Sequence, residues 1–116
     1  MTVRIYHNPR CSKSRQTLAL LRERGIEPDI IEYLKHPPGT DTLSHLLTLL
    51  NLEPRALMRT QETEYKANNL DNPKLSREQL VQALHDHPKL IERPIVVTEQ
   101  RAVIGRPPEN ILTLLE

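Results

Sequence analysis

The sequence predicts an α/β fold whose core is a mixed, four-stranded β-sheet. Short β-branched runs lie near both ends of the chain, and two of them flank a polar turn, which predicts a hairpin. Amphipathic helical spacing separates the first two runs, which predicts a βαβ unit. The 116 residues suit one domain, 1–116, with a helical insertion at about 40–88.

The βαβ unit opens with an alternating strand at residues 3–6 and a turn-like link at residues 7–10. A helix is predicted from Ser12, and Gly25 lies where helices commonly end in a left-handed residue. Residues 30–34 predict the second strand, which a Pro-Pro-Gly corner closes.

The middle of the chain is predicted to be helical. An amphipathic helix follows a cap at Thr40, and Pro54 marks the first turn of a short one. Ser76 and Gln79 form the capping box of a further helix that Pro88 stops. The apolar face of the first of these helices consists of Leu43, Leu46, Leu47 and Leu50.

The C-terminal part predicts a hairpin at residues 95–97 and 102–104, followed by a last helix that Pro107 and Pro108 open. The element order is therefore βαβ, helices, ββα. That order places a parallel pair of strands beside an antiparallel hairpin in one sheet, with the first and last helices on its faces. Thioredoxin-like folds have this plan.

Charge and composition exclude several function classes. Lys and Arg number 16 against 15 Asp and Glu, a net charge of +1, which lacks the basic excess of nucleic-acid-binding domains. No apolar run reaches the ~20 residues of a membrane span, and the N-terminus does not resemble a signal peptide. We therefore expect a cytoplasmic protein that binds neither nucleic acid nor membrane. One cysteine and scattered histidines predict no internal disulfide and no metal site.

Cys11 directly precedes the first predicted helix, where unpaired amides and the helix dipole stabilise a thiolate. Arg10, Lys13 and Arg15 add positive charge nearby. We predict a depressed thiol pKa; the alternative is a buried, unreactive cysteine. Ser14 stands where a two-cysteine redox motif has its resolving thiol, so the site needs a thiol from outside the chain.

A helix start also cradles oxyanions, so the nucleophile and an anion site are expected to coincide. Arg93 precedes Pro94 at the entry of the predicted hairpin, and Arg106 follows Gly105 at its exit, so we expect both near one end of the sheet. The guanidinium fork binds tetrahedral oxyanions bidentately. The alternative for any one arginine is a solvated surface side chain. Arg59, in the helical middle, offers no local clue to its direction.

Four ordered motifs resemble the ArsC-type arsenate reductases, which depend on glutathione and glutaredoxin. The resemblance runs essentially from end to end of the chain. The motifs are YHNPRCSKSR at 6–15, RALMR at 55–59 with EYK at 64–66, IERPIV at 91–96 and GRPPE at 105–109.

The resemblance implies an arsenate reductase in which Cys11 attacks arsenate, or a similar oxyanion, and three arginines stabilise the oxyanion and its cysteine adduct. The three arginines are Arg59, Arg93 and Arg106. The resemblance further implies that His7 and Ser14 help to hold Cys11 as a thiolate. Taken alone, His7 has another interpretation, a loop histidine bonded to backbone.

The resemblance also implies the partners of the reaction. Glutathione, as co-substrate, would attack the adduct, and glutaredoxin would resolve the product to release arsenite, with no bound cofactor. Family members carry a cis proline beside the active site, so the Arg93–Pro94 bond is predicted to be cis. The best-known reductases continue with a further segment beyond the position of Glu116.

Relatives that share the cysteine loop and the Arg-Pro motif leave two alternatives, since one fold hosts several roles. Some relatives are small glutathione-dependent thiol reductases, and the Spx-like ones are redox regulators that bind RNA polymerase. Such sensors often pair the reactive thiol with a resolving cysteine, and Ser14 occupies that place here. The presence of all three arginines also favours the reductase.

Overall fold

The computed structural model describes residues 2–115 and divides into two compact units. The sheet unit comprises the chain up to His36 and again from Arg93 onward. The helical unit is Pro37–Glu92. Each unit has its own elements and its own buried side chains, and each is described separately.

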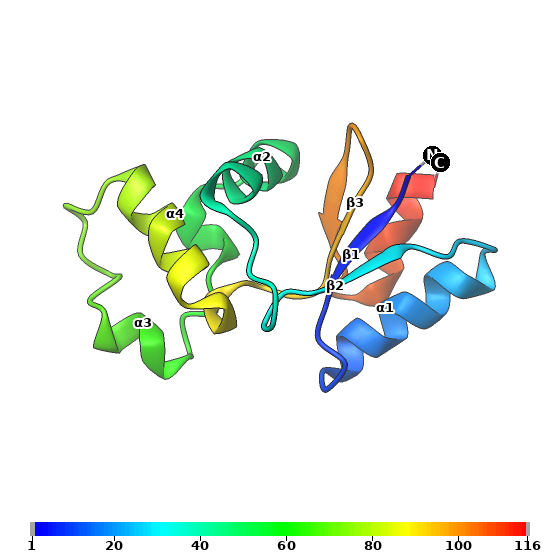
Figure 1. Cartoon of the computed structure of the whole chain (residues 1–116), viewed down its shortest axis with the longest axis horizontal. Coiled ribbons are helices and arrows are strands. Elements are labelled where there is room, and N and C mark those ends of the chain that lie inside the picture. The colour runs from blue at the N-terminus through cyan, green and yellow to red at the C-terminus, as the bar shows by residue number, and fades with distance from the viewer. Residues whose placement is uncertain (1, 116) are drawn as a thin grey trace. The chain divides into compact units, whose positions relative to one another are not determined.

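The sheet unit contains one four-stranded sheet with the strand order β2-β1-β3-β4 (Figure 1). β1 pairs with β2 in parallel and with β3 in antiparallel fashion, and β3 and β4 form the hairpin. The strands are β1 Arg4–His7, β2 Asp29–Glu32, β3 Ile95–Val97 and β4 Ala102–Ile104. The predicted mixed, four-stranded sheet of a thioredoxin-like fold is confirmed.

The second strand is shorter than predicted. We expected it to include Tyr33 and Leu34, whereas β2 ends at Glu32. The carbonyl of Glu32 accepts hydrogen bonds from the amides of Lys35 at 3.0 Å and His36 at 2.9 Å, which turns the chain away from the sheet. The strand therefore stops where this turn begins.

Two helices cover one face of the sheet unit (Figure 1). They are α1, Ser12–Glu23, and the 3₁₀ helix Pro108–Leu115 that forms the predicted last helix. Gly25 follows α1 with a φ of +78°, which confirms the predicted left-handed residue. The apolar cluster between these helices and the sheet consists of Val3, Ile5, Leu18, Leu21, Val96, Ile111 and Leu114.

The helical unit contains five helical segments. They are α2 Thr40–Leu50, the 3₁₀ helix Pro54–Leu57, α3 Thr63–Ala67, α4 Arg77–Asp86 and the 3₁₀ helix Pro88–Leu90. The capping box of α4 is confirmed, because the Gln79 amide donates to Ser76 Oγ at 3.1 Å and the Ser76 amide donates to Gln79 Oε1 at 2.8 Å. The predicted cap at Thr40 is wrong. The carbonyl of Gly39 accepts the first helical hydrogen bond, from Leu43, so Gly39 is the cap and Thr40 begins the helix.

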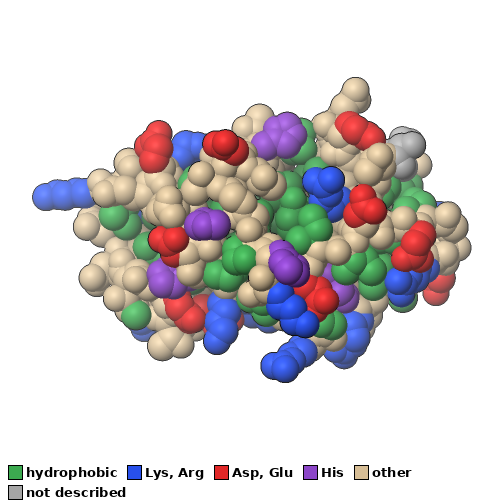
Figure 2. All heavy atoms as spheres, viewed as in Figure 1, with side chains coloured by type: hydrophobic (Ala, Val, Ile, Leu, Met, Phe, Trp, Pro, Cys, Tyr) green, Lys and Arg blue, Asp and Glu red, His purple; other side chains and the backbone are tan. Residues whose placement is uncertain are grey.

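No helix in the described part of the chain is long and apolar enough to span a membrane. Acidic and basic side chains are interspersed on the face shown in Figure 2, as expected for a chain whose net charge is only +1.

Candidate active site

Cys11 occupies the N-cap position of α1, with an extended backbone at φ −93° and ψ 123°. The preceding loop holds it there, because the Cys11 amide donates to the carbonyl of Asn8 at 3.0 Å. The side chain of Asn8 tightens the same loop by accepting from the Arg10 amide at 3.0 Å. Cys11 is 9% exposed, so its sulfur lies at the edge of the protein interior.

The Cys11 thiol is a stronger acid than the thiol of an ordinary cysteine. Burial raises its pKa, but hydrogen bonds from the Ser14 amide, the Arg93 guanidinium and the Lys13 amide outweigh burial, so the pKa lies below its usual 9.0. The predicted direction is confirmed. The predicted effect of the helix amides is confirmed by Ser14 and Lys13. The charged side chain that lowers the pKa is that of Arg93, whereas the side chains of Arg10, Lys13 and Arg15 are not among the causes. Arg15 instead donates to the carbonyl of Pro9 at 3.0 Å.

Two of the predicted site arginines meet at the cysteine. Arg106 Nη2 donates to Cys11 Sγ at 3.5 Å, and Arg106 Nε donates to the backbone carbonyl of Arg93 at 2.7 Å. The pKa of Arg93 is lowered by burial and raised by its hydrogen bonds with Cys11 and Tyr33, and the net direction is upward. The Arg93 guanidinium therefore stays charged, and the guanidinium groups of Arg93 and Arg106 both contact the sulfur.

The β3–β4 hairpin explains why two arginines 13 residues apart lie together. Its register pairs Ile95 with Ile104. The pairing continues one step further, because the Gly105 amide donates to the Pro94 carbonyl at 2.8 Å. Arg93 and Arg106 follow at the next step, at the open end of the hairpin. The Arg93–Pro94 bond is cis, as predicted, and the Arg106–Pro107 bond, for which the sequence analysis made no prediction, is also cis.

His7 and Ser14 contact each other. His7 is the last residue of β1, is 6% exposed, and its Nδ1 lies 2.6 Å from Ser14 Oγ. Ser14 Oγ also accepts from the Asn8 amide at 3.0 Å. Burial is the main cause that lowers the pKa of His7 below 6.5, so the imidazole is neutral at neutral pH. The pair thus braces the loop before Cys11 against the first turn of α1.

Arg59 lies in the helical unit, beside the isolated β-bridge between Met58 and Ile91. Its guanidinium forms ion pairs with Glu62 at 3.3 Å and Glu92 at 3.2 Å, both within that unit. Cys11 belongs to the sheet unit, so the part of Arg59 in the site stays a prediction.

Tyr33 is a neighbour of the site that the sequence analysis missed. It is fully buried, and its phenol interacts with the guanidinium of Arg93. An aromatic residue after a β-branched run is typical of a core position, so the sequence carries no signal for this contact.

Two hollows border the loop that precedes Cys11 in the sheet unit, and His7 and Pro9 line both of them. One is lined by His7, Pro9, Leu18 and Arg22 among others, and the other by Arg10, Glu32, Leu34 and Lys35 among others.

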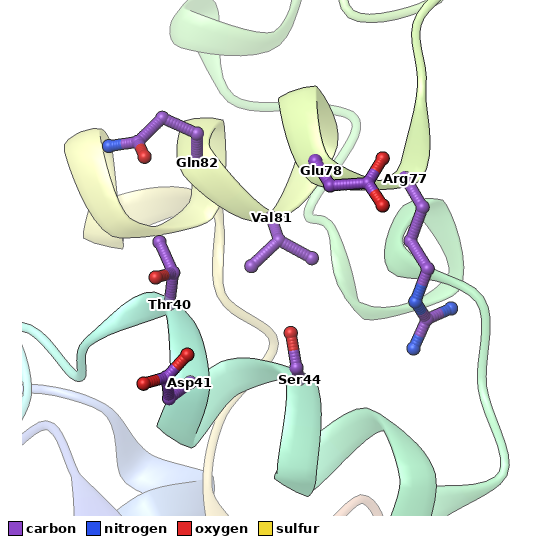
Figure 3. Close-up of a pocket in the computed structure, with 7 residues that line it drawn as sticks. All are labelled: Thr40, Asp41, Ser44, Arg77, Glu78, Val81 and Gln82. Carbon is purple, nitrogen blue, oxygen red and sulfur yellow. The ribbon is translucent and has the colours of Figure 1, made fainter.

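A further pocket lies in the helical unit, between the N-terminal turns of α2 and α4 (Figure 3). Asp41 and Ser44 line it from α2, and Glu78 and Arg77 from α4, but no thiol or histidine reaches it. Among residues 2–115, no three His, Cys, Asp or Glu side chains are grouped to hold a metal ion. The chemistry of the described chain is therefore concentrated at Cys11.

Comparisons with known proteins cover nearly the whole chain and agree on one family. The ArsC family profile matches residues 6–114. Protein YfgD of Escherichia coli K12 is 54% identical over 97% of this chain and 96% of its own. A protein named arsenate reductase from Haemophilus influenzae is 48% identical over 99% of this chain and all of its own. The solved arsenate reductase from Vibrio cholerae superposes with a TM-score of 0.95 at 53% identity, over 97% of each chain. The chain therefore belongs to the ArsC family.

Proposed function

We propose that this protein is an arsenate reductase whose nucleophile is Cys11. The observation that carries the proposal is the thiol of lowered pKa with Arg106 Nη2 3.5 Å from its sulfur and Arg93 hydrogen-bonded to it. A thiolate attacking an oxyanion brings two negative charges together, and two fixed guanidinium groups offset that repulsion. The relatives named arsenate reductase in Haemophilus influenzae and Vibrio cholerae support the choice of oxyanion.

In the first step Cys11 Sγ forms a bond to arsenic, and one arsenate oxygen leaves as water after protonation. The product is a Cys11–S–As(V) adduct. The arginines stabilise the charge that develops on the remaining oxygens, which is greatest in the transition state. Arg59 is proposed as the third guanidinium group, and its ion pairs with Glu62 and Glu92 would have to open, wholly or in part, for it to bind the oxyanion.

Two external thiols would supply the electrons, with no bound cofactor. Glutathione, as co-substrate, attacks the arsenic of the adduct and displaces a second oxygen, which leaves as water. A glutaredoxin thiol then attacks the glutathione sulfur, so the bond between that sulfur and arsenic breaks, its electron pair stays on arsenic, and the two thiols leave as one mixed disulfide. Water finally replaces Cys11 Sγ on As(III), which releases arsenite and regenerates the Cys11 thiol. Cys11 is the single cysteine of the chain and Ser14 replaces a resolving thiol, so an internal disulfide could not complete the cycle.

The test is arsenate-dependent NADPH consumption in an assay coupled through glutathione, glutaredoxin and glutathione reductase. The wild type is compared with Cys11→Ser, Arg93→Ala and the exposed control Arg101→Ala. We expect no turnover from the serine variant, a large defect from Arg93→Ala and near-normal turnover from Arg101→Ala. Omitting glutathione or glutaredoxin in turn should stop turnover.

The same assay has an outcome that overturns the proposal. A wild-type protein with a reactive Cys11 but no turnover with several glutaredoxins would not be an arsenate reductase of this mechanism. The function would then move to thiol reduction or to binding of RNA polymerase, which a pull-down measures directly.

A further inference from the structure

Gly105 lies where α1 packs closely against the end of the hairpin. A Cβ atom at this position would lie 2.6 Å from Thr17 Oγ1, 3.1 Å from Thr17 Cγ2 and 2.9 Å from Pro94 Cγ. Real Cβ contacts are essentially never that short, so only glycine allows this approach without a shift of its neighbours. The φ of Gly105 is not in the left-handed region, so the requirement is for space alone.

Thr17 forms the other side of the contact. It is fully buried on α1, six residues after Cys11. Its hydroxyl donates to the Lys13 carbonyl at 2.8 Å and lies 3.4 Å from the carbonyl of Gly105. A buried hydroxyl thus spans the helix that carries the nucleophile and the strand end that carries the arginines.

The contact fixes both arginines at once. Arg106 is the next residue after Gly105. The Gly105 amide donates a hydrogen bond to the carbonyl of Pro94, which is the next residue after Arg93. A shift of Gly105 away from α1 would therefore carry Arg106 Nη2 away from Cys11 Sγ, now 3.5 Å distant. We propose that Thr17 is a positioning residue that, by its contact with Gly105, sets the distance between the Cys11 sulfur and the Arg93–Arg106 pair. The expected effect of Thr17 on turnover rests on the proposed reductase function, whereas its effect on the distance between Cys11 and the arginines does not.

The first experiment adds the missing Cβ. Gly105→Ala is compared with the matched control Gly39→Ala, where an added Cβ meets no atom within 4 Å. We expect Gly105→Ala to move the pH profile of Cys11 alkylation to higher pH and to lower kcat/KM for arsenate about tenfold, because small misplacements of catalytic groups cost that much or more. The double variant Gly105→Ala with Thr17→Ala removes both close Thr17 atoms and should recover part of the loss.

The second experiment changes the methyl group and the hydroxyl of Thr17 one at a time, so it decides the matter even where Gly105→Ala fails to fold. Thr17→Ser retains the oxygen that touches Gly105, and Thr17→Val replaces it with a methyl group that faces two carbonyls. We expect the serine variant to match the wild type in alkylation profile and kcat. The valine variant should alkylate only at higher pH and have a lower kcat.

An alkylation profile that is the same in Gly105→Ala and Thr17→Val as in the wild type, with urea unfolding showing both variants folded, overturns the proposal. Equal losses in Gly39→Ala and Gly105→Ala would do the same. Because alkylation needs no arsenate turnover, a wild type without reductase activity would refute the proposed function, and the alkylation profiles would still test Thr17.

Discussion

The contact between Arg106 and Cys11 allows a prediction of stated size for Arg106→Ala. A full charge 3.5 Å from a thiolate is worth about 1.2 kcal/mol in water and about 5 kcal/mol at an effective dielectric constant near 20. Arg106 is exposed, so solvent screens the pair and the lower figure applies. A loss of about 1.2 kcal/mol lowers the thiolate population about eightfold at a pH below the thiol pKa.

The assay is the rate of Cys11 alkylation at such a pH, followed by kcat/KM for arsenate. The alkylation rate should fall about eightfold in Arg106→Ala. We expect kcat/KM to fall further, since in the proposed mechanism the same guanidinium also stabilises the charge on the oxyanion. Arg106→Lys keeps the charge but not the fork that reaches both Cys11 Sγ and the Arg93 carbonyl, so it should recover alkylation more than turnover.

Arg101→Ala is the control, because Arg101 is an exposed arginine in the hairpin turn of the same unit. It should leave the alkylation rate within about twofold of wild type, as expected for a surface charge outside the site. A folded Arg106→Ala variant that alkylates as fast as Arg101→Ala would contradict this prediction. The contact with sulfur would then contribute nothing to the thiolate.

Three further predictions concern stability. Burial lowers the pKa of His7, so His7 binds a proton more readily in the unfolded chain than in the folded one. The free energy of unfolding should therefore fall as the pH drops below 6.5, until His7 is protonated in the folded state as well. In urea unfolding at several pH values, His7→Asn should flatten that slope. Ser76→Ala removes the capping box of α4 and should cost about 1 kcal/mol in urea unfolding, and an unchanged unfolding midpoint would contradict the cap. Gly25→Ala, at a φ of +78° with open space around it, should cost about 1 kcal/mol by the same measurement, and a stabilised variant would show that the strain is absent.

The parts of the fold that depend on local sequence could be predicted. The capping box of α4 needs only two residues three positions apart, and the left-handed end of α1 needs only Gly25. The hairpin also follows from its turn and its two β-branched runs. Its register then pairs position 93 with position 106, so the meeting of the two arginines is itself implied by counting outward from the turn.

The contacts that the sequence did not indicate are those between segments distant in the chain. The sequence analysis predicts positive charge near Cys11 from its neighbours in sequence, whereas the guanidinium groups that contact the sulfur belong to Arg93 and Arg106. The role of Tyr33 depends on that same distant arginine. The predicted cap of α2 is wrong for another reason. Thr40 is of a residue type that is preferred at caps, but the backbone forms the first helical hydrogen bond one residue earlier, at Gly39.

The two halves of the site have separate structural origins, and one strand pairing joins them. β1 leads directly into the loop that ends at Cys11, and β3 begins two residues after Arg93. The antiparallel pairing of Tyr6 with Ile95 therefore sets Cys11 beside Arg93 and Arg106. A slip of one residue in this pair would turn every side chain of the strand to the opposite face of the sheet, so the buried residues Ile5 and Val96 oppose it strongly. The geometry of the site is thus determined by the register of the central strands, which lie deepest in the core, and the contact of Thr17 with Gly105 adjusts it from the helix side.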